Sequence, residues 1–150
     1  MIPLKTIEIL IPWLKEMEGF SSTIYRCSGG YKTIGYGHRI QHNEVFFVPL
    51  SPAEAEQVLR ADILSLMLKV QRLITVPLRV NQWAALLSFS FNVGVAALQR
   101  STLRLKVNRQ EHKLVLEEFM KWIWAGGKPS KGLKSRRFKE GLLYEKGLVP

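Results

Sequence analysis

Hydrophobic residues near the start of the chain repeat at intervals of three and four positions, which is the spacing of one helical face. They are Leu4, Ile7, Ile11, Leu14 and Met17. Pro12 falls inside this pattern, so the helix is either kinked there or begins near that residue. Gly19 suits the position after a helix end. We therefore expect an amphipathic helix that ends at Glu18.

Residues 20–50 change to a pattern typical of strands and turns. Gly29-Gly30 marks a turn, and Gly35 and Gly37 flank Tyr36. The side chains that favour strands are Tyr31, Thr33, Ile34 and Tyr36. This segment predicts a small β-hairpin or a three-stranded sheet.

Helical order resumes at Ser51. Ser51 suits an N-cap, Pro52 suits the first helical position, and Glu54 lies three residues after the cap. The predicted helix should end before Pro77. Its expected inward face is Ala55, Val58, Leu59, Ile63, Leu66 and Val70.

The rest of the chain predicts further helices with short breaks. One follows Asn81 and stops near residues 92–94, a short one follows Ser101, one runs from about Gln110 to Trp124 and ends at Gly126-Gly127, and the last runs from about Lys134 to Lys146. These elements predict an α+β fold in one domain over residues 1–150. A small lobe covers about 1–50, a linking helix about 52–74 and an all-α lobe about 78–150, with a cleft between the lobes.

Composition adds charge to this picture. The chain has 150 residues, a formal net charge of +10 and one cysteine. Residues 1–75 are net +1 and residues 76–150 are net +9. A strongly basic half suggests a polyanionic partner: nucleic acid, an anionic membrane or an anionic wall polymer. One cysteine excludes an intrachain disulfide and a zinc site built on cysteines alone.

Two segments lie where a targeting sequence is found or have the length of a membrane span. The first 19 residues contain charges and lack a small-residue cleavage site, so we expect no secretory signal. Arg79 and Arg100 bracket 20 uncharged residues, about the length of a membrane span. This stretch contains polar residues such as Asn92, and also Gly94, which favours a buried central helix over a membrane span.

The densest candidate chemistry lies between Glu18 and His38. Glu18 at a helix C-terminus, with apolar neighbours, should have a raised pKa, and glycosidic bond cleavage needs such a protonated acid. Cys27 and Thr33 follow on the predicted hairpin, where a chain reversal could bring all three to one side of a cleft. Taken singly, Glu18 is equally a solvated helix-end residue and Cys27 an ordinary thiol.

The motifs as a series resemble one known family. The pattern Glu, eight residues, Asp or Cys, five residues, Thr is the active-site signature of phage lysozymes of glycoside hydrolase family 24, and Glu18, Cys27 and Thr33 reproduce it. Other motifs follow in order along nearly the whole chain: Thr33-Ile-Gly-Tyr-Gly-His38, Leu50-Ser51-Pro-Ala-Glu54-Ala, Asn81-Gln82-Trp83 with Ala85-Leu86, Ser88-Phe89-Ser90-Phe91-Asn92-Val93-Gly94, Ser101-Thr102-Leu103, Asn108, Trp122 and Gly132-Leu133-x-x-Arg136-Arg137-x-x-Glu140.

The resemblance implies a lysozyme-like α+β fold and hydrolysis of the β-1,4 bond between N-acetylmuramic acid and N-acetylglucosamine in peptidoglycan. Glu18 would be the acid. Cys27 would hold and activate the attacking water, or act as a nucleophile, and Thr33 would orient that water. Cys27 marks the Cys variant of the signature, and a thiol is a poor base at pH 7 unless its pKa is lowered.

The same resemblance gives the expected binding residues and setting. Asn92, Tyr36, Arg136 and Arg137 are assigned to substrate binding, the last two in a role that is either structural or binding. The expected protein is a monomer without cofactor or metal. It would be made in the host cytoplasm and reach the wall after holin-type release. Control by a membrane anchor and a second cysteine, as in some relatives, is not expected, because the chain shows neither.

Several residues have ordinary structural interpretations. His38 should be hydrogen-bonded in its glycine-rich turn, and His42 and His112 should lie at the surface. Trp83, Trp122 and Trp124 favour core positions over sugar platforms. The basic run from Lys128 to Lys139 is a solvated face or a phosphate-binding one.

Three alternatives to a muramidase stay open. They are a related chitin-cleaving enzyme, a transglycosylase, and a non-catalytic cationic protein that binds wall or membrane. Nucleic-acid binding is not expected, since no recognition motif accompanies the charge.

Overall fold

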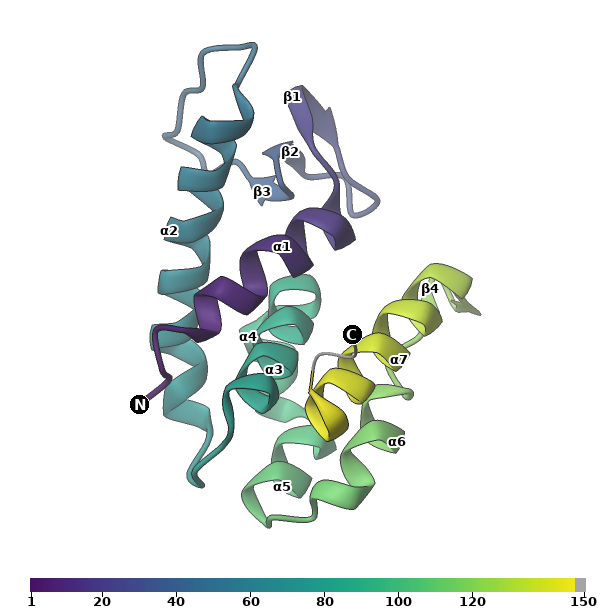
Figure 1. Ribbon diagram of the computed structural model, residues 1–150. Coiled ribbons are helices and arrows are strands. Elements are labelled where there is room, and N and C mark those ends of the chain that lie inside the picture. Colours follow the sequence, from purple (N-terminus) through teal and green to yellow (C-terminus); the bar gives the residue numbers. More distant parts are fainter. Residues whose placement is uncertain (148–150) are drawn as a thin grey trace.

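The protein is described by a computed structural model over residues 1–147, and the last three residues of the predicted helical lobe lie outside that range (Figure 1). Helix α1 spans Thr6–Glu18 and continues through Pro12. It buries Ile7, Leu10, Ile11 and Leu14. The predicted stripe was wrong at its ends, because Leu4 lies before the first helical turn and Met17 is only half-buried.

The small lobe holds the predicted three-stranded sheet. Its strands are β1 (Ser21–Arg26), β2 (Lys32–Gly35) and β3 (His38–Arg39), antiparallel in the order β1-β2-β3. Tyr25 pairs with Thr33, and Ile34 with His38. The side chains of Ile34, Leu50 and Ala55 form a separate small core beneath the sheet.

Helix α2 (Pro52–Val70) runs from the small lobe to the far end of the molecule and continues into the short 3₁₀ helix η1 (Gln71–Leu73). Its predicted capping box is confirmed: the Glu54 N–H donates to Ser51 Oγ at 3.1 Å, and the Ser51 N–H donates to Glu54 Oε1 at 3.2 Å. The buried face includes Met67, which the sequence pattern missed. Val58 and Leu66 are half-buried.

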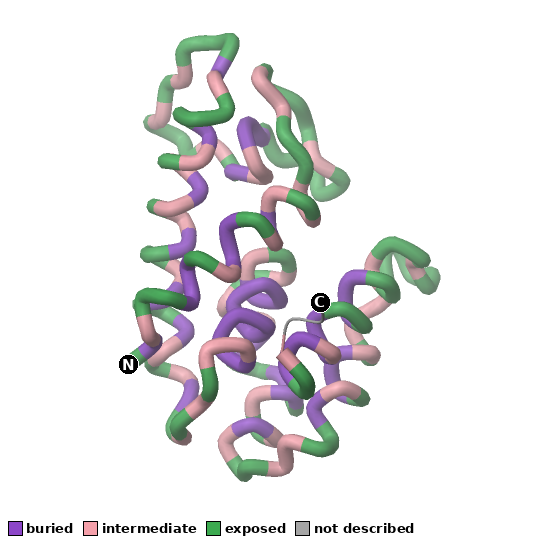
Figure 2. Tube along the Cα trace, in the orientation of Figure 1, coloured by how far each residue is buried: buried purple, intermediate pink, exposed green. Residues whose placement is uncertain are grey.

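The helical lobe is built around α3 (Val80–Val93). Nine consecutive residues, 82–90, are buried, so the uncharged stretch is the predicted central helix (Figure 2). Around it lie α4 (Val95–Arg100), α5 (Thr102–Asn108), the 3₁₀ helix η2 (His112–Leu114), α6 (Val115–Phe119) and α7 (Lys131–Lys146). In the described part of the chain, no helix is both long and apolar enough to cross a bilayer.

The predicted helix from Gln110 to Trp124 was wrong. The chain forms only η2 and α6, and then a two-stranded hairpin of β4 (Trp124–Ala125) and β5 (Lys128–Pro129) around Gly126-Gly127. Both glycines have positive φ, at 57° and 77°, which suits a tight hairpin turn. Trp124 is 60% exposed on this hairpin, so its predicted core position was also wrong.

Helix α7 begins three residues earlier than predicted. Ser130 caps it, because its Oγ accepts a hydrogen bond from the Leu133 N–H at 3.2 Å. The helix packs on α3 and α6 and buries two arginines and a glutamate in the lobe. These charges connect the helical lobe to the end of α1.

Candidate active site

A chain of three adjoining cavities runs between the sheet of the small lobe and helices α3 and α7. The central cavity has a volume of about 550 Å³ and is lined by Glu18, Cys27, Thr33 and Asn92 among others. A second, of about 520 Å³, continues past Gly37 and Phe91 toward α2, and a third, of about 630 Å³, continues past Glu18 and Asn92 toward α7. Four of the predicted site residues therefore share one cleft.

Glu18 lies at the last position of α1, directly before Gly19, whose φ of 69° ends the helix. The Arg136 Nη1 donates to Glu18 Oε1 at 2.7 Å. The expected apolar surroundings of this carboxyl group were therefore wrong, because its nearest polar partner is a guanidinium from α7. The two residues are 118 positions apart in the chain.

Gly37 makes room for the other oxygen of Glu18. A Cβ at position 37 would lie 2.9 Å from Glu18 Oε2, and the φ of Gly37 is 72°. A side chain there would be strained by the backbone and would push against the carboxylate. Glu18 and Gly37 both line the central cavity, so Oε2 lies at the cleft beside Gly37 while Oε1 is held by Arg136.

Arg136 belongs to a buried polar network that fixes Glu18 in place. Its Nη2 donates to the Ser88 carbonyl at 3.0 Å, and its Nε donates to Glu140 Oε2 at 3.3 Å. Ser88 Oγ donates to the same Glu140 oxygen at 2.6 Å and accepts from Trp13 Nε1 at 2.9 Å. Two carboxylates, from α1 and α7, and one backbone carbonyl of α3 thereby hold the guanidinium in one orientation.

Arg137 lies fully buried beside Arg136 and does not line the cleft. It donates to Glu140 Oε1, to Asn92 Oδ1 and to the Trp122 carbonyl, the last at 3.0 Å. Burial lowers the pKa of Arg137, and the carboxylate of Glu140 opposes that effect. Its contacts are those of a residue that positions Asn92, while Asn92 itself reaches the cavity.

Cys27 lies at the turn between β1 and β2, half-exposed to the cleft, and forms no disulfide. Backbone N–H groups of Tyr31 and Gly29 hold the pKa of the Cys27 thiol below its ordinary value. Turn amides that point at sulfur favour the thiolate. The sequence alone predicts a mostly neutral thiol. In the structure, the backbone N–H groups of the turn lower the pKa of this thiol.

Thr33 is buried on β2, and its hydroxyl donates to the Tyr31 carbonyl at 2.9 Å. Tyr36 is a predicted site residue that, like Arg137, lies outside the cleft. Its ring packs against Phe20 with centroids 5.4 Å apart, and the Lys15 ammonium lies 5.3 Å from the Tyr36 ring centroid. It is absent from the lining of the central cavity.

His38 is hydrogen-bonded as predicted. Its Nδ1 lies 2.7 Å from Asp62 Oδ2, and its Nε2 lies 3.0 Å from Glu44 Oε1. His42 is exposed, whereas His112 is half-buried and its Nδ1 lies 2.8 Å from the Tyr144 hydroxyl, so its predicted surface position was wrong. Among residues 1–147, no group of three His, Cys, Asp or Glu side chains is arranged to hold a metal ion.

Three cleft residues escaped the sequence analysis. Tyr25 lines the central cavity together with Cys27, and burial raises the pKa of Tyr25, with further contributions from Glu18 and Cys27. Arg39 and Phe91 lie where the central and second cavities meet. Only Phe91 carried a signal, because it stands inside the motif that also contains Asn92.

The known proteins that are similar to this chain point to one family. The family model described as phage lysozyme matches residues 15–140. The endolysin of Acyrthosiphon pisum secondary endosymbiont phage 1 is 38% identical over 136 residues, covering 88% of this chain and 92% of that protein.

Two solved structures have the same fold. The endolysin from Escherichia coli O157:H7 phage FAHEc1 superposes with a TM-score of 0.84 at 31% identity, covering 100% of this chain and 96% of that one. The P22 lysozyme mutant L86M gives a TM-score of 0.79 at 29% identity, covering 97% and 99%. A family model over most of the chain, these relatives and a cleft with a glutamate at its centre lead to one conclusion: the chain belongs to the phage lysozyme family, and it is a glycoside hydrolase of the lysozyme type.

Proposed function

We propose that this protein is an endolysin muramidase that hydrolyses the β-1,4 bond between N-acetylmuramic acid and N-acetylglucosamine in bacterial peptidoglycan and so lyses the host cell. The observation that carries the proposal is that Glu18, Cys27 and Thr33 line the same central cavity. An acid on one side of a bond and a group that holds water on the other are what glycoside hydrolysis needs.

Glu18 is assigned the role of general acid. Its Oε2, which faces the cleft beside Gly37, would carry the proton to the leaving glycosidic oxygen, while Arg136 holds Oε1. Proton transfer from a positioned carboxylic acid makes departure of the sugar easier. Arg136 then stabilises the carboxylate that remains after the proton has left.

Cys27 and Thr33 are assigned to the attacking water. The water would lie against the Cys27 sulfur, which accepts one of its protons as the new C–O bond forms. The lowered pKa of the Cys27 thiol supports this role, because a thiolate can accept a hydrogen bond and a proton. Direct attack by the sulfur, which would form a covalent glycosyl intermediate, is the second possibility for the same residue.

The biological setting follows from the family and the composition. We propose that the protein is made in the host cytoplasm, works as a monomer and reaches the wall after holin-type release. Its basic half would hold it on anionic wall polymers or on the membrane surface, and nucleic acid is not expected as a partner.

Digestion of purified peptidoglycan tests the activity. Loss of turbidity is expected, and mass analysis should find fragments with a reducing muramic acid end, because hydrolysis adds one water per bond cleaved. Fragments with an anhydro-muramic end would assign a transglycosylase instead. Binding without any fragments would leave a non-catalytic wall-binding protein.

A further inference from the structure

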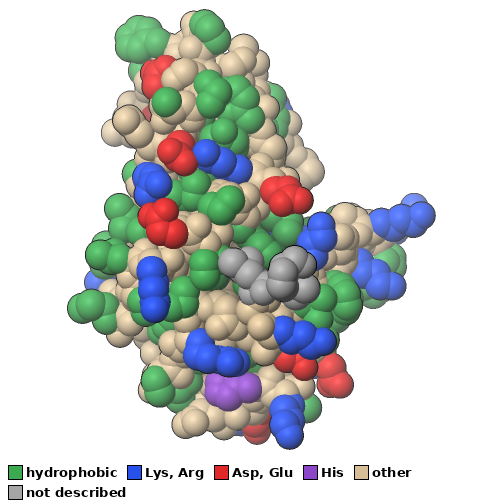
Figure 3. Space-filling view, viewed as in Figure 1, with side chains coloured by type: hydrophobic (Ala, Val, Ile, Leu, Met, Phe, Trp, Pro, Cys, Tyr) green, Lys and Arg blue, Asp and Glu red, His purple; other side chains and the backbone are tan. Residues whose placement is uncertain are grey.

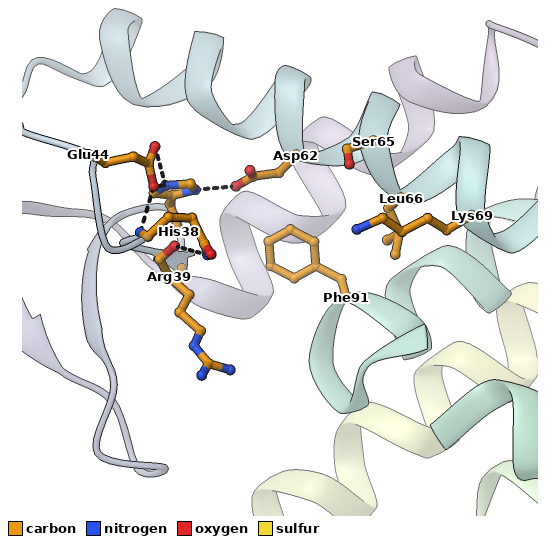
Figure 4. A pocket seen from close by; sticks show the side chains of 10 residues that line it. His38, Arg39, Glu44, Asp62, Ser65, Leu66, Lys69 and Phe91 are labelled. Atoms are coloured by element: carbon orange, nitrogen blue, oxygen red, sulfur yellow. Dashed lines mark hydrogen bonds and ion pairs between the residues drawn. The ribbon is translucent and has the colours of Figure 1, made fainter. Parts of the chain in front are cut away.

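The second cavity, of about 520 Å³, extends the cleft beyond Gly37 toward α2 (Figure 4). Phe91 and Leu66 give it apolar walls of the kind on which sugar rings pack. Two cations also line it, Arg39 from β3 and Lys69 from α2. The cavity therefore combines an aromatic face with positive charge.

The two acids in the same cavity are engaged by His38, whose imidazolium can balance one of the two carboxylates. Asp62 and Glu44 both contact His38, at 2.7 Å and 3.0 Å, and Glu44 Oε1 also accepts the Gln41 N–H at 2.7 Å. The hydrogen bond to Asp62 holds the pKa of His38 above its ordinary value, although burial opposes this, and Glu44 adds to the effect. The three side chains form a closed group in Figure 4, directed at one another.

Arg39 and Lys69 lack such partners. Within residues 1–147, neither makes an ion pair, and both are exposed. The Arg39 guanidinium lies 3.2 Å from the ring centroid of Tyr31. Stacking on a ring orients a guanidinium and leaves the N–H groups along its edge free for a planar anion. In Figure 4 the Lys69 side chain points toward the Phe91 ring, and Arg39 lies on the other side of that ring.

We propose that Arg39 and Lys69 bind a carboxylate on the 3-O-lactyl substituent of muramic acid, and that this contact makes the cleft select wall glycan over chitin. The inference rests on the proposed muramidase function. The carboxylate is either that of the lactyl group itself or one carried by the attached stem peptide. Chitin has neither, because every sugar in it is neutral N-acetylglucosamine.

Three forms of one glycan test the inference. Intact peptidoglycan carries peptide carboxylates, amidase-treated glycan carries free lactyl carboxylates, and the treated glycan coupled to methylamine carries no charge. Kinetics are measured for the wild type, Arg39→Gln, Arg39→Lys and Lys69→Gln. Lys5→Gln is the matched control, because Lys5 is exposed directly before α1 and lines none of the three cavities.

The wild type should show a lower KM for at least one charged glycan than for the methylamide. Arg39→Gln and Lys69→Gln should each reduce that preference by roughly threefold to tenfold, mainly through KM. Arg39→Lys should retain part of it, because the charge stays but the planar guanidinium is lost, and Lys5→Gln should retain it in full. If the glutamine variants lose the preference only on intact peptidoglycan, the bound group is the peptide carboxylate. If they lose it on the amidase-treated glycan, the bound group is the lactyl carboxylate.

An equal KM of the wild type for all three glycans would overturn the inference while leaving the muramidase intact. So would a preference that survives in both glutamine variants. Failure of the wild type to cleave any of the three glycans would overturn the proposed function and this inference together.

Discussion

Glu18 is a carboxyl group with two unlike oxygens. Oε1 accepts from Arg136 at 2.7 Å, and Oε2 faces the cleft beside Gly37, where a Cβ would approach it to 2.9 Å. An amide in place of the carboxyl group would still offer Oε1 to the guanidinium, so the fold should tolerate it. The amide cannot deliver a proton to a leaving oxygen.

Glu18→Gln should therefore fold normally and lose most of its activity, by about 10²–10⁴-fold, the usual contribution of general acid catalysis. Turbidity clearance and thermal unfolding of the same preparation measure both properties. Glu8→Gln, on the same helix and distant from the cleft, is the control and should clear walls like the wild type. Clearance by Glu18→Gln at the control's rate would remove Glu18 from the acid role.

Cys27 should tolerate Asp, because a carboxylate is small, ionised at neutral pH and able to hold a water molecule. Cys27→Ser should be weaker, and Cys27→Leu should be folded but inactive. Iodoacetamide should inactivate the wild type and spare Cys27→Asp. Since the pKa of the thiol is lowered by the amides around it, alkylation should already be fast at pH values below the ordinary thiol pKa of about 8.5.

Residual muramidase activity and the mass of the alkylated peptide are the measurements for this series. Cys27 is the only cysteine of the chain, so one adduct accounts for the whole effect. Full activity of the fully alkylated protein would mean that Cys27 has no role in catalysis, and only Glu18 and Thr33 would then keep their assigned roles.

At the scale of elements, His38 joins three segments: β3, which carries it, α2 through Asp62, and the intervening loop through Glu44. A histidine whose folded pKa is raised stabilises the fold fully below its unfolded pKa, about 6.5. That contribution is lost as the pH rises through the higher folded pKa. The pKa of Glu44 is lowered by the Gln41 N–H and by His38 against the effect of burial, so its carboxylate is still charged at pH 5.5.

His38→Gln should therefore lower Tm most near pH 5.5 and less at pH 9. The difference between the two pH values should be about 2–4 °C for each kcal/mol that the charged contact contributes. Thermal unfolding followed by circular dichroism measures it. His42→Gln changes an exposed histidine of the same loop and should show no such dependence on pH. A pH-independent loss in His38→Gln would assign the residue a packing role only.

Much of the element structure was predictable because its signals are local. The cap at Ser51, the end of α1 at Gly19 and the central helix all follow from neighbours within a few residues. The β4–β5 hairpin was missed because Gly126-Gly127 suits both the end of a helix and a hairpin turn, and the aromatic segment before it was assigned to a helix. The partner of Glu18 could not be found locally, because Arg136 meets it only once α7 has packed on α3.

On the scale of the whole molecule, positive charge is concentrated on the helical lobe. Residues 76–150 are net +9, and Figure 3 shows Lys and Arg side chains spread over that lobe and along the arm formed by the hairpin and the start of α7. Lys139 of the basic run lines the third cavity, whereas Lys128, Lys131 and Lys134 are exposed outside it. The run is thus divided between cleft and outer surface.

Lysis of whole cells should fall as salt rises, because the screening length shortens to about 3 Å at 1 M. Replacing Lys128, Lys131 and Lys134 by Gln should flatten this dependence, since these charges hold the enzyme on anionic walls without entering the cleft. Cleavage of a short soluble oligosaccharide by the triple variant should match that by the wild type. If the triple variant showed the same salt dependence on whole cells as the wild type, these lysines would form a solvated surface that does not bind the wall.

The hydrogen bond from Arg137 to Asn92 has a consequence for recognition. Because Arg137 donates to the Asn92 carbonyl oxygen, that oxygen is directed toward Arg137, and we expect the NH₂ group to serve the cleft as a donor. Its natural complement is a carbonyl oxygen, such as that of a sugar N-acetyl group. Asn92→Asp would gain an ion pair with Arg137 yet present a repelling oxygen to that carbonyl. It should therefore bind N-acetylated oligosaccharides at least tenfold more weakly by titration calorimetry, while Asn92→Ala should lose less.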